Sequence, residues 1–370
     1  MNLSGKALPS GKGPALPPPG QNKNNRCSTR RRTQMKFFGK LAAAAFAGAL
    51  VTSAAVAQDM TFFRIGTGGA GGTYFPVGGL IANAISNPPG SRACEEGGNC
   101  GVPGLVAMAQ STNASAHNVN AVQAGQMEAG MTGAATLYFA YNGVGVFEGN
   151  AKPDLRVIAN LFPEDLHLVM PKGASMSSLQ DLKGKRVSIA QAGSGTQIAV
   201  ELILAAHGIT RDDYEVYELN NSQSAERLAD GQLDAYFYAA GTPVSAMIQL
   251  DNTKGMELYD WPEAELVAGN EAVPYYIKSL IPAGTYPGVT YDVDTLAVSG
   301  MLVTHANQDE ELIYQITKAM WSPTARKLLD SGHPKGKAIT LESALDGLDG
   351  IGVPLHPGAE RFYREAGVLN

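Results

Sequence analysis

The chain has 370 residues, of which 44% are hydrophobic, and its 28 Lys and Arg against 34 Asp and Glu give a formal net charge of −6. Residues 1–57 contain nine of the basic residues and no acidic one, which leaves 19 against 34, or −15, in residues 58–370. So acidic a surface argues against nucleic acid or an anionic membrane as a partner. An anionic ligand would have to be held by local dipoles and hydrogen bonds. A chain of this length usually divides into two lobes.

The first residues have the composition of a leader. Residues 1–34 are rich in Pro, Gly, Asn and Arg, so we predict a disordered or mis-called extension. Residues 35–57 combine two lysines, an apolar run and a final Ala-Val-Ala, which predict a signal peptide cleaved between Ala57 and Gln58. The apolar run is too short to span a bilayer. We therefore expect export to the periplasm. A twin-arginine signal is the alternative, although the arginines at 30–32 lack the residues that usually follow.

A glycine-rich turn, Gly-Thr-Gly-Gly-Ala-Gly-Gly over 66–72, lies between a strand predicted over 61–65 and a helix predicted over 76–86. Free N–H groups at a helix N-terminus favour an anion or a carbonyl group, so we predict that this turn is one wall of a small-molecule cleft. The spacing also matches the dinucleotide fingerprint, but loop-like sequence at 86–90 replaces the acidic residue that the fingerprint requires. No Gly-Lys-Ser/Thr follows. A purely structural turn is the other alternative.

Two cysteines remain after the leader, because Cys27 leaves with it. Cys94 and Cys100 enclose the five residues Glu-Glu-Gly-Gly-Asn. In an exported protein such a close pair in a flexible loop predicts a disulfide, which would stiffen the loop over 87–104. Metal binding is the alternative, but no histidine lies near enough in sequence to complete a site.

Strand-like and helix-like segments alternate along the rest of the chain. The predicted strands are 105–109, 129–132, 155–161, 167–170, 186–190 and 235–238. Helical segments are predicted after 115, through the tyrosines at 138 and 141, over 197–207 and after 243. Such alternation predicts an α/β fold with parallel sheets and helices on both faces.

The same local pattern recurs at four places. A strand leads into a small, polar or glycine-rich turn that opens a helix at 66–76, 109–116, 190–197 and 238–244. Ligands of open α/β sheets bind at the carboxyl ends of strands, next to helix N-termini. Any one of these turns alone is more often a helix cap. Because two lie early in the exported chain and two in its middle third, together they predict a cleft between two lobes.

No catalytic constellation is found in the sequence. Gly193-Ser194-Gly195 lacks the spacing of a nucleophile elbow, and the six histidines show no zinc spacing. His167 lies inside an apolar strand, where a hydrogen-bonded core residue is the better interpretation than a base. Glu164 belongs to a surface connection or faces the cleft. We therefore expect a protein that is not an enzyme and has no metal.

Tyrosines accompany the turns. Tyr74, Tyr236 and Tyr238 lie beside them, where a phenol can pack on a ligand and donate a hydrogen bond. Because Tyr236 and Tyr238 share one face of a strand, either both point toward the cleft or both point into a core between sheet and helices.

Several collinear stretches, spread over about 63–367, resemble the TAXI family, the solute receptors of TRAP transporters. They include the glycine turn with Thr73-Tyr74, the cysteine loop leading into 111–118, Ala-Asn-Leu at 159–161 with Pro163-Glu164, Asp-Leu-Lys-Gly-Lys-Arg-Val-Ser at 181–188, Gly-Ser-Gly-Thr at 193–196, Asp-Gly-Gln-Leu-Asp-Ala at 230–235, Pro-Ala-Gly-Thr-Tyr at 282–286 and Pro-Leu-His-Pro-Gly-Ala at 354–359. Each motif alone is weak evidence. Their order along nearly the whole exported chain carries the resemblance.

The resemblance implies a two-lobed periplasmic-binding-protein fold of type II-like architecture, with a mainly parallel sheet in each lobe and a ligand cleft between them. One lobe is expected at 59–163 plus 294–370 and the other at 164–293. The implied partners are a small carboxylate, such as glutamate, glutamine or 2-oxoglutarate, and TRAP-type membrane permease subunits; no cofactor is implied. We expect a monomer. The implied ligand-binding residues are Gly69, Gly71, Thr73, Tyr74, Ser111, Asn113, Ser115, Asn118, Ala135, Ser194, Gly195, Thr196, Tyr236, Tyr238 and Gly241.

The sequence departs from the family pattern where specificity is expected. Gly133, Ala134 and Ala135 stand where many relatives have Gln-Ser-Asp, and Gln191 stands where relatives often carry an acidic residue. Thr242 replaces a frequent tyrosine. Because an ammonium group favours a carboxylate partner, these losses favour a dicarboxylate or oxo-acid without an amine. Two other function classes stay open: a periplasmic sensor that pairs with a signalling protein, and an exported enzyme.

Overall fold

Two long antiparallel strands run through the middle of the protein. The computed structural model describes residues 60–369, so the extension and signal peptide predicted over 1–57 lie outside the described residues. β6 (Leu155–Pro171) pairs with β12 (Val293–His305), and both are mostly buried. Their burial on both faces explains their nearly continuous apolar sequence.

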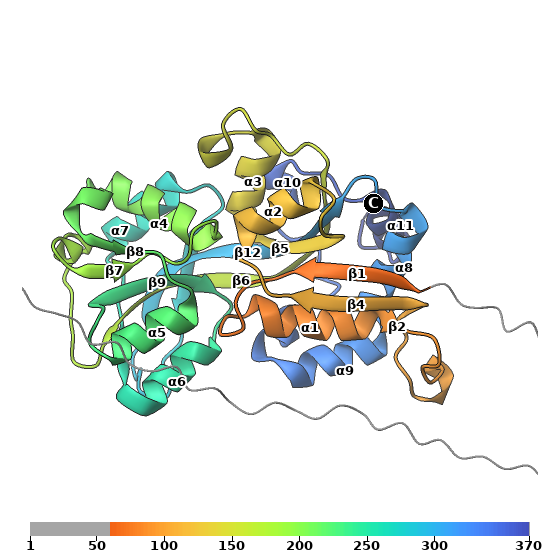
Figure 1. Ribbon diagram of the computed structural model, residues 1–370, viewed down its shortest axis with the longest axis horizontal. Coiled ribbons are helices and arrows are strands. Elements are labelled where there is room, and N and C mark those ends of the chain that lie inside the picture. The colour runs from red at the N-terminus through yellow and green to blue at the C-terminus, as the bar shows by residue number, and fades with distance from the viewer. Residues whose placement is uncertain (1–59, 370) are drawn as a thin grey trace, which may run out of the picture. The chain divides into compact units, whose positions relative to one another are not determined.

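Parallel strands flank this central pair on both sides (Figure 1). Beyond β12 the order is β5 (Ala129–Gly133), β1 (Thr61–Gly66) and β4 (Leu105–Gln110); beyond β6 it is β9 (Ala235–Ala240), β7 (Arg186–Ser188) and β8 (Glu215–Tyr217). The strands within each group are parallel to one another, and each group joins the central pair in antiparallel fashion. The prediction of a two-lobed α/β fold is confirmed, with the parallel sheet of each lobe joined through the two shared strands. The lobe boundaries stay a prediction.

Four short strands complete the described sheets. β10 (Met256–Leu258) pairs with the end of β6, and β11 (Ile277–Ile281) pairs with the start of β12. β2 (Ser86–Asn87) and β3 (Val102–Pro103) form a separate ribbon at the base of the cysteine loop. The disulfide between Cys94 and Cys100 closes that loop, with 4.8 Å between the two Cα atoms, which confirms the predicted pairing.

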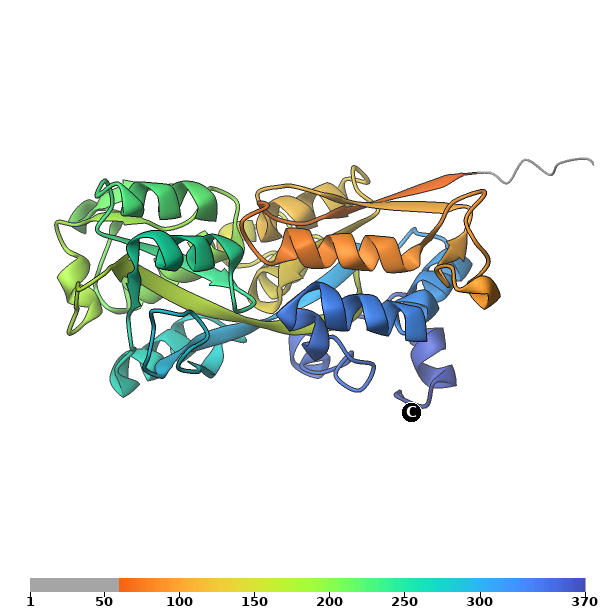
Figure 2. The same cartoon turned by 90° about the horizontal axis from the view of Figure 1, so that it is seen from below.

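The helices pack on both faces of the sheet (Figures 1 and 2). They are α1 (Tyr74–Ile85), α2 (Ser115–Gln123), α3 (Ala134–Asn142), α4 (Gly195–Ala206), α5 (Asn221–Ala229), α6 (Ser245–Lys254), α7 (Glu263–Ala272), α8 (Glu310–Met320), α9 (Pro323–Gly332), α10 (Leu348–Ile351) and α11 (Pro357–Glu365). Within residues 60–369, no helix is both long and apolar enough to cross a membrane.

Side-chain alternation along β6 divides the core between the two faces. Val157 belongs to the apolar cluster beneath α2, α3 and α4, whereas its neighbour Ile158 belongs to the cluster beneath α1, α8 and α11. Successive residues of a strand point to opposite faces, so one strand contributes to both cores. A third cluster lies beneath α5 and α6.

The prediction of two strands over 155–161 and 167–170 is wrong, because both segments belong to the single strand β6. Pro163 lies between the two predicted segments, and proline cannot donate to the ladder. Its side chain is exposed, and register shifts in the pairing with β12 accommodate the irregularity nearby. The strand over 293–305 was not predicted at all, although its apolar sequence is as continuous as that of β6.

We predict that Tyr286→Phe lowers the free energy of unfolding by about 1–3 kcal/mol. The Tyr286 side chain is completely buried, and its hydroxyl accepts a hydrogen bond from the Val244 amide at 3.1 Å and pairs with His167 Nε2 at 2.8 Å. Without the hydroxyl, both buried groups lose a partner. Urea unfolding measures the change.

The matched control is Tyr314→Phe, whose hydroxyl bonds to Glu365 in an exposed contact. It should change the unfolding free energy by less than about 0.5 kcal/mol. Equal losses in the two variants would contradict the role assigned to the Tyr286 hydroxyl.

Candidate functional site

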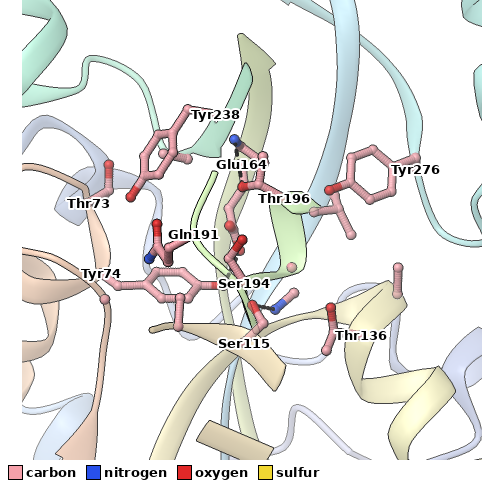
Figure 3. Close-up of a pocket in the computed structure, with 18 residues that line it drawn as sticks. Thr73, Tyr74, Ser115, Thr136, Glu164, Gln191, Ser194, Thr196, Tyr238 and Tyr276 are labelled. Atoms are coloured by element: carbon pink, nitrogen blue, oxygen red, sulfur yellow. Dashed lines mark hydrogen bonds between the residues drawn. The ribbon is translucent and has the colours of Figure 1, made fainter. Parts of the chain in front are cut away.

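A cavity lies where the turns that precede α1, α2, α3 and α4 come together (Figure 3). Its volume is about 30 Å³, which is room for about two or three water molecules at roughly 10–15 Å³ each, so an organic ligand enters only if the walls move apart. Eight of the predicted ligand-binding residues line it: Thr73, Tyr74, Ser115, Ala135, Ser194, Gly195, Thr196 and Tyr238.

The N-cap residues of four helices line this cavity. They are Thr73 of α1, Ala114 of α2, Gly133 of α3 and Ser194 of α4. Each helix has at least nine residues, and each N-terminus carries free N–H groups and a partial positive charge. Three of these helices come from the segment before Glu164 and one from the segment after it. The cavity therefore offers concentrated donors without a basic side chain.

Hydroxyl side chains connect these turns to one another. Ser115 Oγ accepts from the Gly133 amide at 3.2 Å, which links the starts of α2 and α3. Thr196 Oγ1 accepts from the Ala239 amide at 3.1 Å, which links the start of α4 to the end of β9. One bond therefore fixes α2 against α3, and the other fixes α4 against β9, at the edge of the cavity.

Glu164 is the acidic residue on the cavity wall, and the 18 residues that line the cavity include no Lys, Arg or His. Its side chain is 5% exposed, and its Oε1 accepts a hydrogen bond from the Tyr74 hydroxyl. Burial raises the pKa of Glu164 to about 8; the Tyr74 hydrogen bond and the Lys335 charge act against this rise, and the charge of Asp165 adds to it. At neutral pH the carboxyl is mostly protonated in the empty cavity.

Gln191 carries an unsatisfied group at the same site. It lines the cavity, is 9% exposed, and its Oε1 has no hydrogen-bond partner among the described residues. An unpaired buried amide group costs free energy, which a ligand that pairs with it would recover. This observation is independent of the helix N-termini and also indicates a ligand.

Glycine carbonyls join the central segment, 164–293, to the segments that flank it. Gly71 O accepts from Asn221 Nδ2 at 3.0 Å and from the Ala246 amide at 3.3 Å. Thr73 Oγ1 donates to Gly241 O at 2.5 Å, and the His117 amide donates to Gly193 O at 3.2 Å. A Cβ on Gly72 would meet Tyr238 Oη at 2.3 Å, so the glycine turn is in close contact with β9.

The other seven predicted site residues lie outside this cavity wall. Gly71 and Gly241 make the contacts just described. Asn118 is buried, and its Nδ2 donates to Thr67 O and Met131 O, so it ties the first turn to β5. Gly69, Ser111 and Asn113 are exposed or half-buried on the turns, and Tyr236 is completely buried. Their roles in ligand binding stay predictions.

Tyr236 and Tyr238 occupy one face of β9, as their spacing requires, but meet different surroundings. Both belong to the core beneath α5 and α6, but only Tyr238, near the end of the strand, also lines the cavity. Two residues advance a strand by about 6.6 Å, which is enough to pass from core to cavity. His167 is a core residue: its Nδ1 pairs with Tyr238 O at 3.0 Å and its Nε2 with Tyr286 Oη at 2.8 Å.

Three polar wall residues were not on the predicted list: Glu164, Gln191 and Thr136. An acidic pair inside the apolar run of β6 was the available signal for Glu164, and the position directly after β7 was the signal for Gln191. Tyr276, which lies between α7 and β11, had no sequence signal. The preference for a ligand without an amine depended on the lack of a carboxylate at the site, and Glu164 removes that reason.

Comparison with known proteins identifies a family. The model of the NMT1-like family matches residues 65–367. The chain is similar in fold to the alkanesulfonate-binding protein SsuA from Xanthomonas axonopodis pv. citri bound to MOPS, with 18% identity, a TM-score of 0.43 and coverage of 83% of this chain and 84% of that one. It is also similar to a putative L-cystine ABC transporter protein from Listeria monocytogenes, with 14% identity, a TM-score of 0.43 and coverage of 76% and 98%.

We predict that the contribution of Glu164 to stability falls as pH rises from about 5 to 8 and that Glu164→Gln removes this contribution from the slope of the unaltered protein. Burial raises the pKa of Glu164 to about 8 in the folded protein, whereas the ordinary pKa of a glutamate side chain is 4.5. Between those values the folded state binds more protons than the unfolded state, so the unfolding free energy falls by up to about 1.4 kcal/mol per pH unit. Urea unfolding at pH 5, 6.5 and 8 measures both slopes.

Glu226→Gln on the exposed surface of α5 is the control and should keep the slope of the unaltered protein. If Glu164→Gln also keeps that slope, Glu164 is ionised in the folded protein at neutral pH.

Proposed function

This chain belongs to the NMT1-like family, and from that premise we propose that it is a periplasmic solute-binding protein that captures a small carboxylate. The observation that carries the proposal is the convergence of four helix N-termini on one cavity. A carboxylate accepts hydrogen bonds from free N–H groups and is favoured by the positive end of the helix dipole. The cavity wall has no basic side chain, and residues 58–370 have a net charge of −15. Backbone dipoles, rather than basic side chains, would therefore hold the carboxylate.

Hinge closure is the mechanism that we propose. Ligand contacts contributed by both the central and the flanking segments exist together only when the segments meet. Such a ligand shifts the population toward the closed state, since it binds that state more tightly. The hydrogen bonds to the glycine carbonyls stabilise the closed state, although these glycines do not line the cavity.

The partner that we propose is a TRAP-type membrane permease, on the resemblance of the sequence to TAXI receptors. The periplasm is the proposed location, reached through the predicted signal peptide. A permease that accepts the closed, loaded receptor would complete the transport cycle.

We expect a thermal-shift screen to identify one organic-acid class. The protein is unfolded and refolded to remove bound ligand, then tested against dicarboxylates, oxo-acids, amino acids, sugars and nucleotides. A ligand at 100 times its dissociation constant stabilises the native state by about 2.7 kcal/mol and raises the melting temperature. A shift with nucleotides or sugars alone would overturn the carboxylate assignment.

We expect Asn221→Ala to weaken ligand binding about two- to tenfold, because it removes a hydrogen bond worth about 0.5–1.5 kcal/mol. The Asn221 amide donates to Gly71 O but does not line the cavity, so its loss acts on closure alone. Isothermal titration with the ligand found in the screen measures the change.

Asn252→Ala on the exposed face of α6 is the matched control and should leave the affinity unchanged. Unaltered affinity in both variants would mean that the Gly71 contact is made in the open state as well.

A further inference from the structure

The cavity has two chemically different sides. The four helix N-termini supply hydrogen-bond donors, whereas Glu164 is a carboxyl group surrounded by tyrosines. Tyr74, Tyr238 and Tyr276 all line the same space, and each interacts electrostatically with Glu164. A carboxylate among aromatic rings is an environment that favours a cation, through charge-assisted hydrogen bonds and cation–π contacts. The two sides together match a molecule that carries both charges.

We propose that Glu164 is the specificity-determining residue for an ammonium group on the ligand, and that it releases its proton to solvent when this ligand binds. The inference rests on the proposed function, since the carboxylate of the same ligand occupies the helix N-termini. The ligand class is a small amino acid, and the buried ion pair between Glu164 and the ammonium group replaces the neutral carboxyl of the empty cavity.

The charged side chains around Glu164 do not supply a cationic partner for it. Lys335 is the basic residue that acts on Glu164, but its Nζ lies 3.5 Å from Asp165 Oδ2 and it does not line the cavity. Asp165 also accepts hydrogen bonds from Thr242 and from Ser279 Oγ, the latter at 2.7 Å. The Lys335 charge is therefore already matched by Asp165. A cation that pairs with the ionised form of Glu164 therefore has to be part of the ligand.

The groups around Glu164 determine where its proton goes when the ligand binds. Burial raises the pKa of Glu164 to about 8 in the empty cavity, and the facing tyrosines Tyr74, Tyr238 and Tyr276 have pKa values raised by their own burial, so they stay neutral at pH 7. An adjacent ammonium group favours the ionised carboxyl. Glu164 then goes from COOH to COO⁻, and the proton passes to the buffer. The ligand's own ammonium keeps its protons.

Two matched ligand pairs test the inference: L-glutamate with 2-oxoglutarate, and L-alanine with pyruvate. Within each pair the molecules differ in carrying an ammonium group or a carbonyl oxygen at the same carbon. Titration calorimetry of the purified protein at pH 7 in phosphate and in Tris gives the affinity and the number of protons released. We expect the amino member of at least one pair to bind roughly tenfold or more tightly than its partner. About one proton should leave per ligand at pH 7 and far less at pH 9.

Glu164→Gln should abolish the proton release and reduce the preference for the amino member to less than about twofold, because a neutral amide gains no ion pair. Glu226→Gln should retain both properties. Tighter binding of the oxo-acids, or proton release that persists in Glu164→Gln, would overturn the inference while leaving the proposed function intact. If no member of either pair binds, the inference is overturned, whereas the carboxylate assignment falls only if no carboxylate in the thermal-shift screen stabilises the protein.

Discussion

The antiparallel pairing of β6 with β12 determines where every other part of the site can lie. β12 borders the parallel group that begins with β5, and β6 borders the parallel group that begins with β9, so the two groups belong to one sheet and lie on either side of its middle. Glu164 stands opposite Val298 in this pairing, and both line the cavity. The floor of the site is therefore made by the strands that connect the two halves, and its walls are made by the turns of each half.

Water exclusion gives this arrangement its electrostatic strength. Dipoles and charges interact more strongly in a buried site than in solvent, and a buried charge without a partner is costly. The raised pKa of Glu164 reduces that cost because the carboxyl is mostly protonated at neutral pH, and the same carboxyl accepts the hydrogen bond of the Tyr74 hydroxyl. Binding of a carboxylate by helix N-termini needs no change of protonation in the protein, because backbone N–H groups do not titrate. The two sides of the cavity thus respond differently to pH.

Local sequence patterns predicted the individual turns but not which residues the fold brings together at the cavity. The glycine turn, the polar turn before α2 and the turn before α4 each contribute residues to the cavity, and each was recognisable from its residue types. Glu164 was ambiguous because an acidic residue beside Pro163 is typical of an exposed connection. Only the pairing of β6 across its full length shows that this residue is buried. Tyr276 reaches the site through tertiary packing, which no local pattern encodes.

The contacts between the central and flanking segments converge on the carbonyls of Gly71, Gly193 and Gly241. A backbone acceptor is the same whatever side chain the residue carries, so these contacts depend on chain path rather than on residue identity at the acceptor. The cavity wall, by contrast, also presents side chains, among them those of Glu164, Gln191 and Tyr238. Substitutions on the cavity wall can therefore change the chemistry of the cavity while the contacts between the segments remain. The path of the chain and the chemistry of the wall can thus change independently of each other.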